Sequence, residues 1–459
     1  MTRANSNGTH QLILLELNEI NFDIVDRYLS SVQLPAFEKL MAGSSVRTTA
    51  EQEYESLEPW IQWPSVHCGL SAAEHSVFRL GDILHSNAPQ LFEQLENAGL
   101  RVGAISPMNA ANRLNNPAYF IPDPWTKTPS DSSWWSRALT TAVSQAVNDN
   151  SKQSITPRSA SYLALGLMRF AQPKHYETYL RLVSQSRGAP WRKALLLDLL
   201  LHDVHMRMFA ARRPDFSALF LNAGAHIQHH YFFNAHAIRD QLEIRNPEWY
   251  IDATVDPFEE MLHVYELILR DYQSLQGVEL IVATGLSQRP YDRVKFYYRL
   301  RNHAEFIRAL GIACRAVTPR MTRDFLIEFD SAEQALAAQR RLESVLVDAD
   351  TPLFGNIDNR GTSLFVTLTY AREVTDTTVF RVDDRAIPLK EAVVFVAIKN
   401  GMHQGKGFAY FTPEVTRYAP NEGDHVKTLY GTITRYFGVR PPFREPKFAQ
   451  RIEHAAAPA

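Results

Sequence analysis

The sequence predicts an α/β protein whose central, mostly parallel sheet is covered by helices on both faces. Three short apolar runs, at residues 11–17, 218–221 and 278–283, lack the polar alternation of a half-exposed strand. Polar residues follow each run, and the first two runs lead into helical patterns. Because ligands bind at the carboxyl ends of strands in open α/β sheets, these polar residues are the first candidates for a functional site.

The first apolar run contains one acid and ends at two further polar residues, Asn18 and Glu19. A charge inside such a run, here Glu16, loses several kcal/mol of hydration unless it is paired or bound to a metal. These three residues are therefore candidate metal ligands. Asn21 is expected to cap a helix that follows directly, which completes the strand, polar tip and helix of an α/β unit.

The second run leads into a cluster of Asn222, His226, His229 and His230. Asn222 and His226 are four residues apart, a spacing that can place an amide and an imidazole on one metal ion or one phosphate. The alternative is a set of hydrogen-bonded histidines at the start of a helix. Three histidines beside one strand end leave both interpretations open.

Residues 51–82 are rich in tryptophan, proline and polar side chains. A simple core element would not need Glu58, Gln62, Trp63 and His67 so close together, so we expect a loop that lines the site and enters a helix. The alternative is a packed loop whose tryptophans fill a groove.

The remaining pattern divides the chain into five segments. Residues 301–390 contain two helices and a strand in the order of a small α+β insert, and residues 134–213 are helical. We expect a first core part (1–133), a helical insertion (134–213), a second core part (214–300), a cap insert (301–390) and a last core strand with the C-terminal segment (391–459).

The last core segment begins with an apolar run from residue 392 that ends in Lys399, Asn400 and His403. Glycines at 401, 405 and 407 would let the backbone approach a ligand closely. We interpret this run as a fourth strand with a polar tip, the alternative being a glycine-rich turn with a surface histidine. His202 and His205, on the predicted helix of the insertion, are expected to be structural.

Composition excludes several classes of protein. The 459 residues are 45% hydrophobic and 21% charged, which is ordinary for a globular protein with an ample core. A net charge of −2 provides no field that would attract nucleic acid or an anionic membrane. Cys68 and Cys314 lie too far apart for a disulfide framework or a zinc ribbon. The polar N-terminus lacks the core of a signal peptide and no run reaches the ~20 apolar residues of a membrane span, so we expect a cytoplasmic protein.

The segment from Trp63 to Phe78, WPSVHCGLSAAEHSVF, resembles the stretch just after the nucleophile in the alkaline phosphatase superfamily. The branch it resembles most is that of the type I phosphodiesterases and nucleotide pyrophosphatases. Cys68 stands at that family's threonine and Ser76 at its second glycine. The order of strands and polar tips extends the resemblance over most of the chain, and it implies the family fold with two metal ions, usually zinc.

Carried over residue by residue, the resemblance retains about half of that metal site. Asn18 matches the first-strand aspartate of the family. Asn222 and His226 match its Asp-x-x-x-His pair, and His403 matches its late histidine. A single half-site would therefore remain.

The other half of the family's site has different residues in this sequence. The family's Asp-His pair falls on Gly285 and Leu286, whose side chains cannot bind metal. Its threonine nucleophile falls at about Gln62, with Glu58 a short step upstream. A mechanism with two metal ions is therefore not expected.

The first functional hypothesis is a hydrolase or transferase that acts on a phosphate ester or diester. It would bind at most one divalent ion, which would be zinc, manganese or calcium. Its substrate would be a small phosphorylated or glycan-linked molecule. Glu58 would be the nucleophile or general base, His67 or His229 would assist the leaving oxygen, and Lys399 would neutralise phosphate charge. The predicted metal ligands are Glu16, Asn18, Glu19, Asn222, His226 and His403.

The second hypothesis is a catalytically silent relative that keeps the fold as a binding or assembly module. It would bind ligand without turnover. A third interpretation, nucleic-acid binding through Arg320, Arg323, Arg340 and Arg341 of the insert, is disfavoured because few aromatic side chains lie nearby for stacking. The sequence leaves open whether the protein forms a homo-oligomer.

Overall fold

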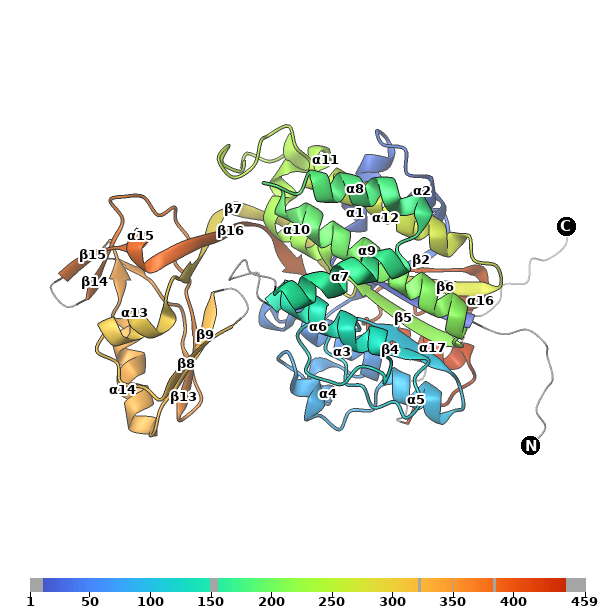
Figure 1. Cartoon of the computed structure of the whole chain (residues 1–459), viewed down its shortest axis with the longest axis horizontal. Helices are drawn as coiled ribbons and strands as arrows, with labels where there is room; N and C mark the ends of the chain where they lie inside the picture. The colour runs from blue at the N-terminus through green and yellow to red at the C-terminus, as the bar shows by residue number, and fades with distance from the viewer. Residues whose placement is uncertain (1–10, 149–155, 321–322, 349, 383–384, 443–459) are drawn as a thin grey trace, which may run out of the picture.

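The computed structural model describes residues 11–148, 156–320, 323–348, 350–382 and 385–442. The first ten residues, for which the sequence predicts no signal peptide, lie outside the described residues. A large α/β body contains the main sheet, and a smaller domain projects from one side of it (Figure 1). A two-stranded ribbon joins the two parts.

The main sheet is mostly parallel, which confirms the predicted fold class. Its order is β2-β17-β6-β1-β5-β3-β4, and β17 runs antiparallel to both of its neighbours. The central strand β1 pairs in parallel with β5 on one side and with β6 on the other. The strands are β1 (Gln11–Leu17), β2 (Ser44–Thr49), β3 (Val102–Ile105), β4 (Tyr119–Ile121), β5 (Phe216–Leu221), β6 (Val278–Ala283) and β17 (Lys406–Phe411).

Helices cover both faces of this sheet because side chains of β1 point alternately into two apolar layers. Ile13 and Leu15 belong to one layer, whereas Leu12 and Leu14 belong to the other. On the first face lie α1 (Phe22–Leu29), α2 (Pro35–Met41), α9 (Pro190–Arg212), α10 (Ala223–Tyr231), α11 (His236–Arg239) and α12 (Pro257–Gln273). On the second face lie α3 (Pro59–Cys68), α5 (Leu91–Asn97), α16 (Pro413–Thr416) and α17 (Thr428–Tyr436), and the short α4 (Ala72–His75) follows α3.

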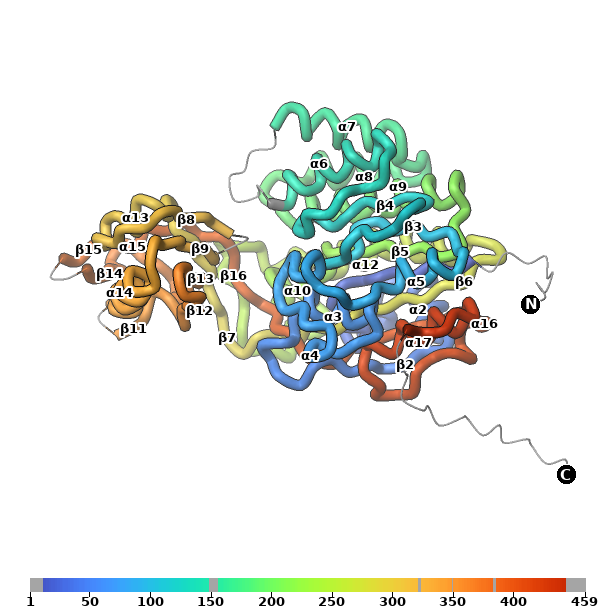
Figure 2. Tube along the Cα trace, turned by 90° about the horizontal axis from the view of Figure 1, so that it is seen from below, coloured from blue at the N-terminus to red at the C-terminus, as the bar shows by residue number. Residues whose placement is uncertain are grey.

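Three further helices, α6 (Trp134–Asn148), α7 (Pro157–Phe170) and α8 (Tyr176–Ser184), pack outside the first face together with α9. Figure 2 shows this group on the side of the body opposite to α16 and α17. His205 of α9 is buried and bonds Ser217 Oγ at 2.8 Å and the Tyr272 hydroxyl at 2.7 Å. These contacts fit the structural role expected for His205.

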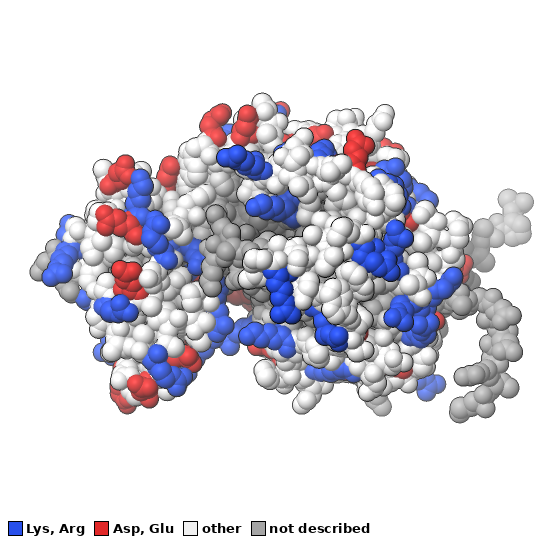
Figure 3. All heavy atoms as spheres, viewed as in Figure 1, with Lys and Arg blue, Asp and Glu red and all other residues white. Residues whose placement is uncertain are grey.

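The small domain has an apolar core of its own. Its two four-stranded sheets have the orders β11-β10-β14-β15 and β12-β13-β9-β8. On the face in Figure 3, acidic and basic side chains lie side by side on this domain. Its elements are α13 (His303–Ala309), β8 (Ala316–Pro319), β9 (Asp324–Glu328), α14 (Ala332–Glu343), β10 (Leu346–Val347), β11 (Thr351–Pro352), β12 (Asp358–Asn359), β13 (Ser363–Thr367), β14 (Val379–Val382), β15 (Arg385–Pro388) and α15 (Leu389–Ala392).

Two elements differ from the sequence-based expectation. The expected loop that enters a helix is shorter than predicted, because the segment around Trp63 already belongs to the helix α3, with one proline at its first turn and Pro64 inside it. The apolar run from residue 392 is a strand, β16 (Val393–Gln404), but it lies outside the main sheet and pairs antiparallel with β7 (Ser287–Leu300) as the connecting ribbon. The last strand of the main sheet is β17, which follows β16 directly.

Crossing a membrane needs a helix that is both long and strongly apolar, and the described part of the chain contains no such helix.

Candidate active site

Polar residues that follow three neighbouring strands, β1, β5 and β6, meet beyond the carboxyl ends of these strands; we call this side of the main sheet its polar edge. β1 and β5 stay in parallel register to their last residues, and the next residues, Asn18 and Asn222, are hydrogen-bonded through their side chains at 2.8 Å. Beyond β6, the carbonyl of Thr284 accepts a hydrogen bond from the backbone N–H of Glu19 at 3.0 Å. The strand register therefore assembles the polar edge that the sequence predicts.

Glu19 has an unusual backbone conformation at this edge. Its φ is 62°, in the left-handed region that non-glycine residues rarely adopt. Such a conformation costs roughly 1 kcal/mol or more and persists only where surrounding contacts enforce it. Here the Glu19 carbonyl accepts a hydrogen bond from Gln228 Nε2 at 2.9 Å. Strained residues of this kind cluster at functional sites.

Glu19, His229 and His403 form a compact group, which we call the Glu-His-His cluster. Glu19 Oε2 lies 3.1 Å from His229 Nε2 and 3.1 Å from His403 Nε2, and the two imidazole nitrogens are 3.2 Å apart. Glu19 and His403 are almost fully buried, whereas the His229 side chain is 21% exposed. Three potential ligand atoms thus face one another beside a partly exposed ring.

Two buried glutamines hold this cluster in place. Gln288 Nε2 donates to Glu19 Oε2 and to the carbonyl of Ala225 in α10. Gly401 of β16 lies against both glutamines, because a Cβ there would come within 2.1 Å of Gln288 Oε1 and 2.6 Å of the Gln228 carbonyl oxygen. The close approach of β16 to α10 therefore requires glycine at this position.

Opposite charges stabilise the cluster. Burial raises the pKa of Glu19, but the charges of His403 and His229 and their hydrogen bonds outweigh it and hold the pKa well below the usual value. Burial lowers the pKa of His403, yet the Glu19 carboxylate reverses this effect and leaves the pKa raised. At His229 burial dominates and the pKa is lowered. A metal ion binds an ionised carboxylate and neutral imidazoles, so an ion in this cluster would displace the proton that Glu19 favours on His403.

Glu58 lies next to the cluster, at the N-cap position of α3. Its Oε2 is 3.6 Å from His403 Nδ1, the ring nitrogen opposite to the one that meets Glu19. Burial raises the pKa of Glu58, which the charges of His403 and Lys399 oppose. Burial lowers the pKa of Lys399, and the charge of Glu58 opposes that change. A carboxyl group with a raised pKa beside a cluster of this kind suits general acid-base chemistry.

Asn18 and Asn222 support the cluster through their amides. Asn18 Oδ1 accepts a hydrogen bond from Trp63 Nε1 at 2.8 Å, and Asn222 Oδ1 accepts one from Asn18 Nδ2 at 2.8 Å. Asn18 Nδ2 also donates to Glu19 Oε1 at 3.1 Å. Both predicted ligands thus engage their amide oxygens, the atoms that bind metals, within the protein, and they help to position Glu19.

Glu16 and His67 form a separate pair that lies deeper in the body. Glu16 precedes Asn18 by two residues on β1, and His67 follows Trp63 by about one turn of α3. Glu16 Oε1 is 2.9 Å from His67 Nε2, and both side chains are buried. The carboxylate in the apolar run therefore has a partner, and the pair faces the second apolar layer rather than the Glu-His-His cluster.

His226, a ligand predicted from the histidine-rich stretch, lies apart from the cluster. Its ring centroid is 4.8 Å from that of His230, one turn along α10. Burial lowers the pKa of His226 to about 4. His230 Nδ1 meets the carbonyl of Ile398 at 3.2 Å. The structure thus places His229, rather than His226, beside His403.

Positions that the family resemblance singles out have other roles here. Gln62, aligned with the nucleophile, is buried and donates from Nε2 to the carbonyl of Ser56 at 2.8 Å. Gly285 has a φ of 70°, and a Cβ there would lie 3.1 Å from the Trp63 ring. Leu286 is fully buried. Trp63 therefore lies against Gly285, and neither Gly285 nor Leu286 has a side chain that could bind a metal ion.

Two other groups of histidines and acids lie away from this edge. The first, in η4 (Pro173–His175), α9 and α12, is fully enclosed, and Lys174 and Tyr179 also bond its two aspartates. The second is partly exposed on α11 and α12. In the first group Lys174 balances the charge of one aspartate, and the side chains of the second group are partly exposed to solvent. Neither group therefore resembles the Glu-His-His cluster. The groups are His175, His202, Asp203 and Asp271, and His236, Asp256 and Glu259.

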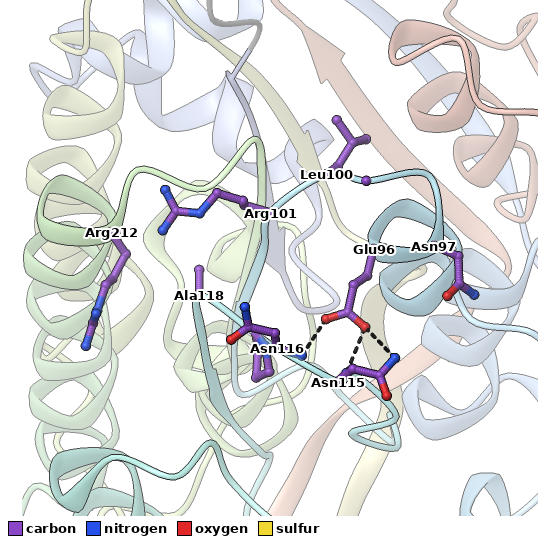
Figure 4. A pocket seen from close by; sticks show the side chains of 10 residues that line it. Glu96, Asn97, Leu100, Arg101, Asn115, Asn116, Ala118 and Arg212 are labelled. Carbon is purple, nitrogen blue, oxygen red and sulfur yellow. Dashed lines mark hydrogen bonds between the residues drawn. The ribbon is translucent and has the colours of Figure 1, made fainter.

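A pocket of about 400 Å³ opens at the opposite edge of the sheet. Its residues precede β3 and β4, and Glu96 there accepts hydrogen bonds from Asn115 and Asn116 (Figure 4). The pocket lies at the amino ends of the strands, whereas the Glu-His-His cluster lies beyond their carboxyl ends, so this pocket is distinct from the candidate site.

Sequence reasoning missed several residues that shape the site. Gln288 lies where β6 has ended and the ribbon begins, and a glutamine after a strand carries no special signal. Lys295 and Tyr297 lie on β7, whose pattern of charges and aromatics resembles an ordinary exposed strand. Their place beside Lys399 depends on the pairing of β7 with β16, which is not visible in either segment alone.

The chain is similar in fold to solved structures of the alkaline phosphatase superfamily, as its sequence predicts. A comparison with protein-family models gives no match, and a comparison with curated proteins gives none either. At the identities found among solved structures, the likeness concerns the fold alone. The similar structures include Sinorhizobium meliloti phosphonoacetate hydrolase in complex with phosphonoacetate (13% identity, TM-score 0.42, 94% of this chain and 96% of that chain), murine ectonucleotide pyrophosphatase/phosphodiesterase 5 (8%, 0.43, 95% and 97%) and Thermus thermophilus alkaline phosphatase (13%, 0.41, 96% and 93%).

Proposed function

We propose that the protein is a hydrolase of phosphate esters or diesters that uses one divalent metal ion held by the Glu-His-His cluster. The observation that carries the proposal is the convergence of Glu19 Oε2, His229 Nε2 and His403 Nε2 within 3.2 Å of one another. Imidazole and carboxylate are common ligands of zinc and manganese, whereas calcium prefers oxygen ligands. Zinc or manganese is therefore favoured over calcium.

The donor atoms fit such an ion. Around a tetrahedral zinc ion with bonds of about 2.0–2.1 Å, donors lie roughly 3.3 Å apart. The corresponding distances here are 3.1, 3.1 and 3.2 Å. The lone pairs of two imidazole nitrogens and one carboxylate oxygen repel one another at these distances. A proton or a metal ion shared between them removes this repulsion. Three protein ligands would also leave a position open for water or substrate, as in catalytic zinc sites.

Glu58 is the residue best placed to move a proton. In the proposed reaction its carboxylate accepts a proton from the water that attacks phosphorus. The ester P–O bond breaks, its electron pair stays on the leaving oxygen, and that oxygen takes a proton from solvent. Lys399 offsets negative charge on the substrate, and Asn18 and Gln288 hold Glu19. A divalent ion in the cluster would supply Lewis acidity toward a phosphoryl oxygen.

His67, predicted as a catalytic residue, receives no step in this proposal. Its contact with Glu16 lies beneath the polar edge, and the pair is buried. His229 is assigned to the metal rather than to the leaving oxygen, because its Nε2 is the atom that meets Glu19. A second ion is not proposed, because Trp63 and Leu286 fill the space beside Gly285.

The test is elemental analysis of the purified protein for zinc, manganese and calcium. We expect close to one ion per chain, and we expect it to be lost in His229→Ala but retained in His226→Ala. These two histidines lie on the same helix three residues apart, so the second variant controls for the loss of an imidazole. Equal metal content in all three proteins, or none in the wild type, would refute the assignment of the ligands.

A second candidate function is a binding module without turnover. It is favoured by Gly285 and Leu286, which stand at the positions of one pair of family ligands. Its signature would be saturable binding of a phosphate ester by the metal-loaded wild type, with no release of phosphate or alcohol over many hours. Hydrolysis that depends on both His229 and Glu58 would exclude it.

A further inference from the structure

The ribbon that joins the small domain to the body contains two lysines directly opposite each other. Lys295 of β7 and Lys399 of β16 are cross-strand partners in the antiparallel register. Like charges at such positions are destabilising, because side chains of directly opposed residues project from the same face of the pair. Within the described part of the chain, no ion pair joins either ammonium group to a carboxylate. The charge of Glu58 offsets part of this repulsion at Lys399, whereas at Lys295 the charges of Arg323 and Arg293 add to it.

Aromatic rings gather further positive charge at the same place. The Lys295 ammonium lies 5.6 Å from the ring centroid of Tyr291 and 5.9 Å from that of Tyr297. The Lys399 ammonium lies 5.9 Å from both centroids. The Arg323 guanidinium, from the small domain, lies 4.1 Å from the Tyr297 centroid. Three cations from three segments thus lie near the Tyr297 ring, and the two lysines also lie near the Tyr291 ring.

The charged forms of both lysines are disfavoured at this place. Burial and the nearby cations Arg323 and Lys399 lower the pKa of Lys295 to about 8. Burial also lowers the pKa of Lys399. Asp324 is the acid next to Arg323 in sequence, and its Oδ1 accepts a hydrogen bond from Thr367. An anion between the lysines would remove their mutual repulsion.

The position of Lys399 connects this group with the candidate active site. Lys399 precedes His403 by four residues on β16, a distance of about 13 Å along an extended strand. The charge of Glu58, which lies beside His403, acts on Lys399. The three cations therefore lie on the small-domain side of Glu58, where the outer part of a substrate would extend from the cluster.

We propose that Lys295, Lys399 and Arg323 bind a second phosphate group of the substrate, on the part that lies beyond the reacting ester. This inference rests on the proposed function for the identity of the ligand as substrate, although the anion site itself does not require a metal. Two ammonium groups and a planar guanidinium match the charge and the several oxygens of a phosphate better than a single carboxylate. Tyr291 and Tyr297 would border the same group.

The first test measures binding in chelator-treated protein, which removes any contribution of the metal. Calorimetry with inorganic pyrophosphate at low salt compares the wild type with Lys295→Met, with the charge-retaining Lys295→Arg, and with Lys390→Met. Lys390 is an exposed lysine of α15 in the small domain, and it pairs with Asp376. We expect at least tenfold weaker binding in Lys295→Met, and wild-type affinity in Lys390→Met.

Lys295→Arg separates charge from shape and is expected to bind within about threefold of the wild type. Pyrophosphate binding that is absent in the wild type, or unchanged in Lys295→Met, would overturn the inference. Malonate bound as tightly as pyrophosphate would overturn the choice of phosphate over carboxylate. Because the metal is absent, a failure here is independent of the elemental analysis that tests the proposed function.

The second test uses turnover by the metal-loaded protein on two esters that differ only in a distal phosphate. Lys295→Met should raise KM at least tenfold for the ester with the distal phosphate and change kcat little. It should leave the KM of the ester without this group unchanged. An equal rise of KM for both esters would show that Lys295 acts on the structure of the site rather than on the distal phosphate. That result would overturn the inference.

Discussion

Glu58 Oε2 lies 3.6 Å from Nδ1 of His403, while Nε2 of the same ring meets Glu19 at 3.1 Å. One imidazole therefore bridges two carboxylates, of which Glu19 follows the end of β1 and Glu58 lies at the N-cap position of α3. Such a carboxylate on the far nitrogen of a metal-binding histidine fixes the orientation of the ring and raises its basicity. Glu58 can thus act as a base, as an orienting group for His403, or as both.

Glu58→Gln should separate these two roles. If Glu58 is the general base, activity falls by roughly 10²–10⁴-fold, and the acidic limb of the rate profile that reports its ionisation disappears. If it only orients His403, metal affinity falls by about 10–100-fold and saturating metal restores the activity. Activity at saturating metal as a function of pH is the measurement, and Glu53→Gln on the exposed loop before α3 is the control.

Metal binding should stabilise the fold through Glu19. An ion that binds only the native state at 100 times its Kd adds about 2.7 kcal/mol of stability. We expect added zinc or manganese to raise the melting temperature of the chelator-treated wild type and to leave that of Glu19→Gln almost unchanged. Glu38→Gln, an exposed acid on α2, should respond like the wild type. An equal thermal shift in Glu19→Gln would contradict the ligand assignment.

Gly401→Ala should disrupt the cluster, because its Cβ would lie 2.1 Å from Gln288 Oε1 and 2.6 Å from a backbone carbonyl oxygen. Overpacking of this kind typically costs about 1–3 kcal/mol. Gly405→Ala on the same stretch is the matched control, since its nearest neighbours would lie at 3.5 Å. Urea unfolding and metal content are the measurements. Full stability with bound metal in Gly401→Ala would contradict the account of this contact.

His205 should make stability depend on pH below neutrality. Burial lowers its pKa to about 3, whereas in the unfolded chain it is near 6.5. Between these values the unfolded state binds a proton that the native state does not, so stability decreases as pH falls from about 6.5 toward 3. At pH 4.5 the loss attributable to this group is roughly 2–3 kcal/mol.

The corresponding variant is His205→Gln. It should be less stable than the wild type at pH 7, because bonds to Ser217 and Tyr272 are altered, but its stability should fall less between pH 7 and 4.5. His85→Gln, at an exposed position, should follow the wild type at both pH values. If His205→Gln and the wild type lost the same free energy of unfolding between pH 7 and 4.5, His205 would not titrate as described.

Strand ends and one helix cap could be read from the sequence because their signals are local. The runs around β1, β5 and β6 have the composition of strands buried on both faces, and Asn21 caps α1 through its side chain, as expected. The sequence also marked the carboxyl ends of these strands as the functional edge. That edge is where Glu19 and His229 lie.

The composition of the cluster could not be read in the same way. His226 and His229 are three residues apart, so they point only about 60° apart around α10, and the packing of that helix decides which of the two rings meets Glu19. The apolar run of β16 looks like a strand of the main sheet, because packing against α10 and the small domain selects the same residue types. Gln288 and Lys295 enter the site only through the pairing of β7 with β16.

The ribbon leads from the small domain directly into β17 of the main sheet, and Gly405 is the residue between them. Within the Glu-His-His cluster, His403 is supplied by this ribbon, whereas Glu19 and His229 belong to the body. The third ligand therefore lies on the same strand that leads to the small domain, so the course of the ribbon sets the geometry of the cluster.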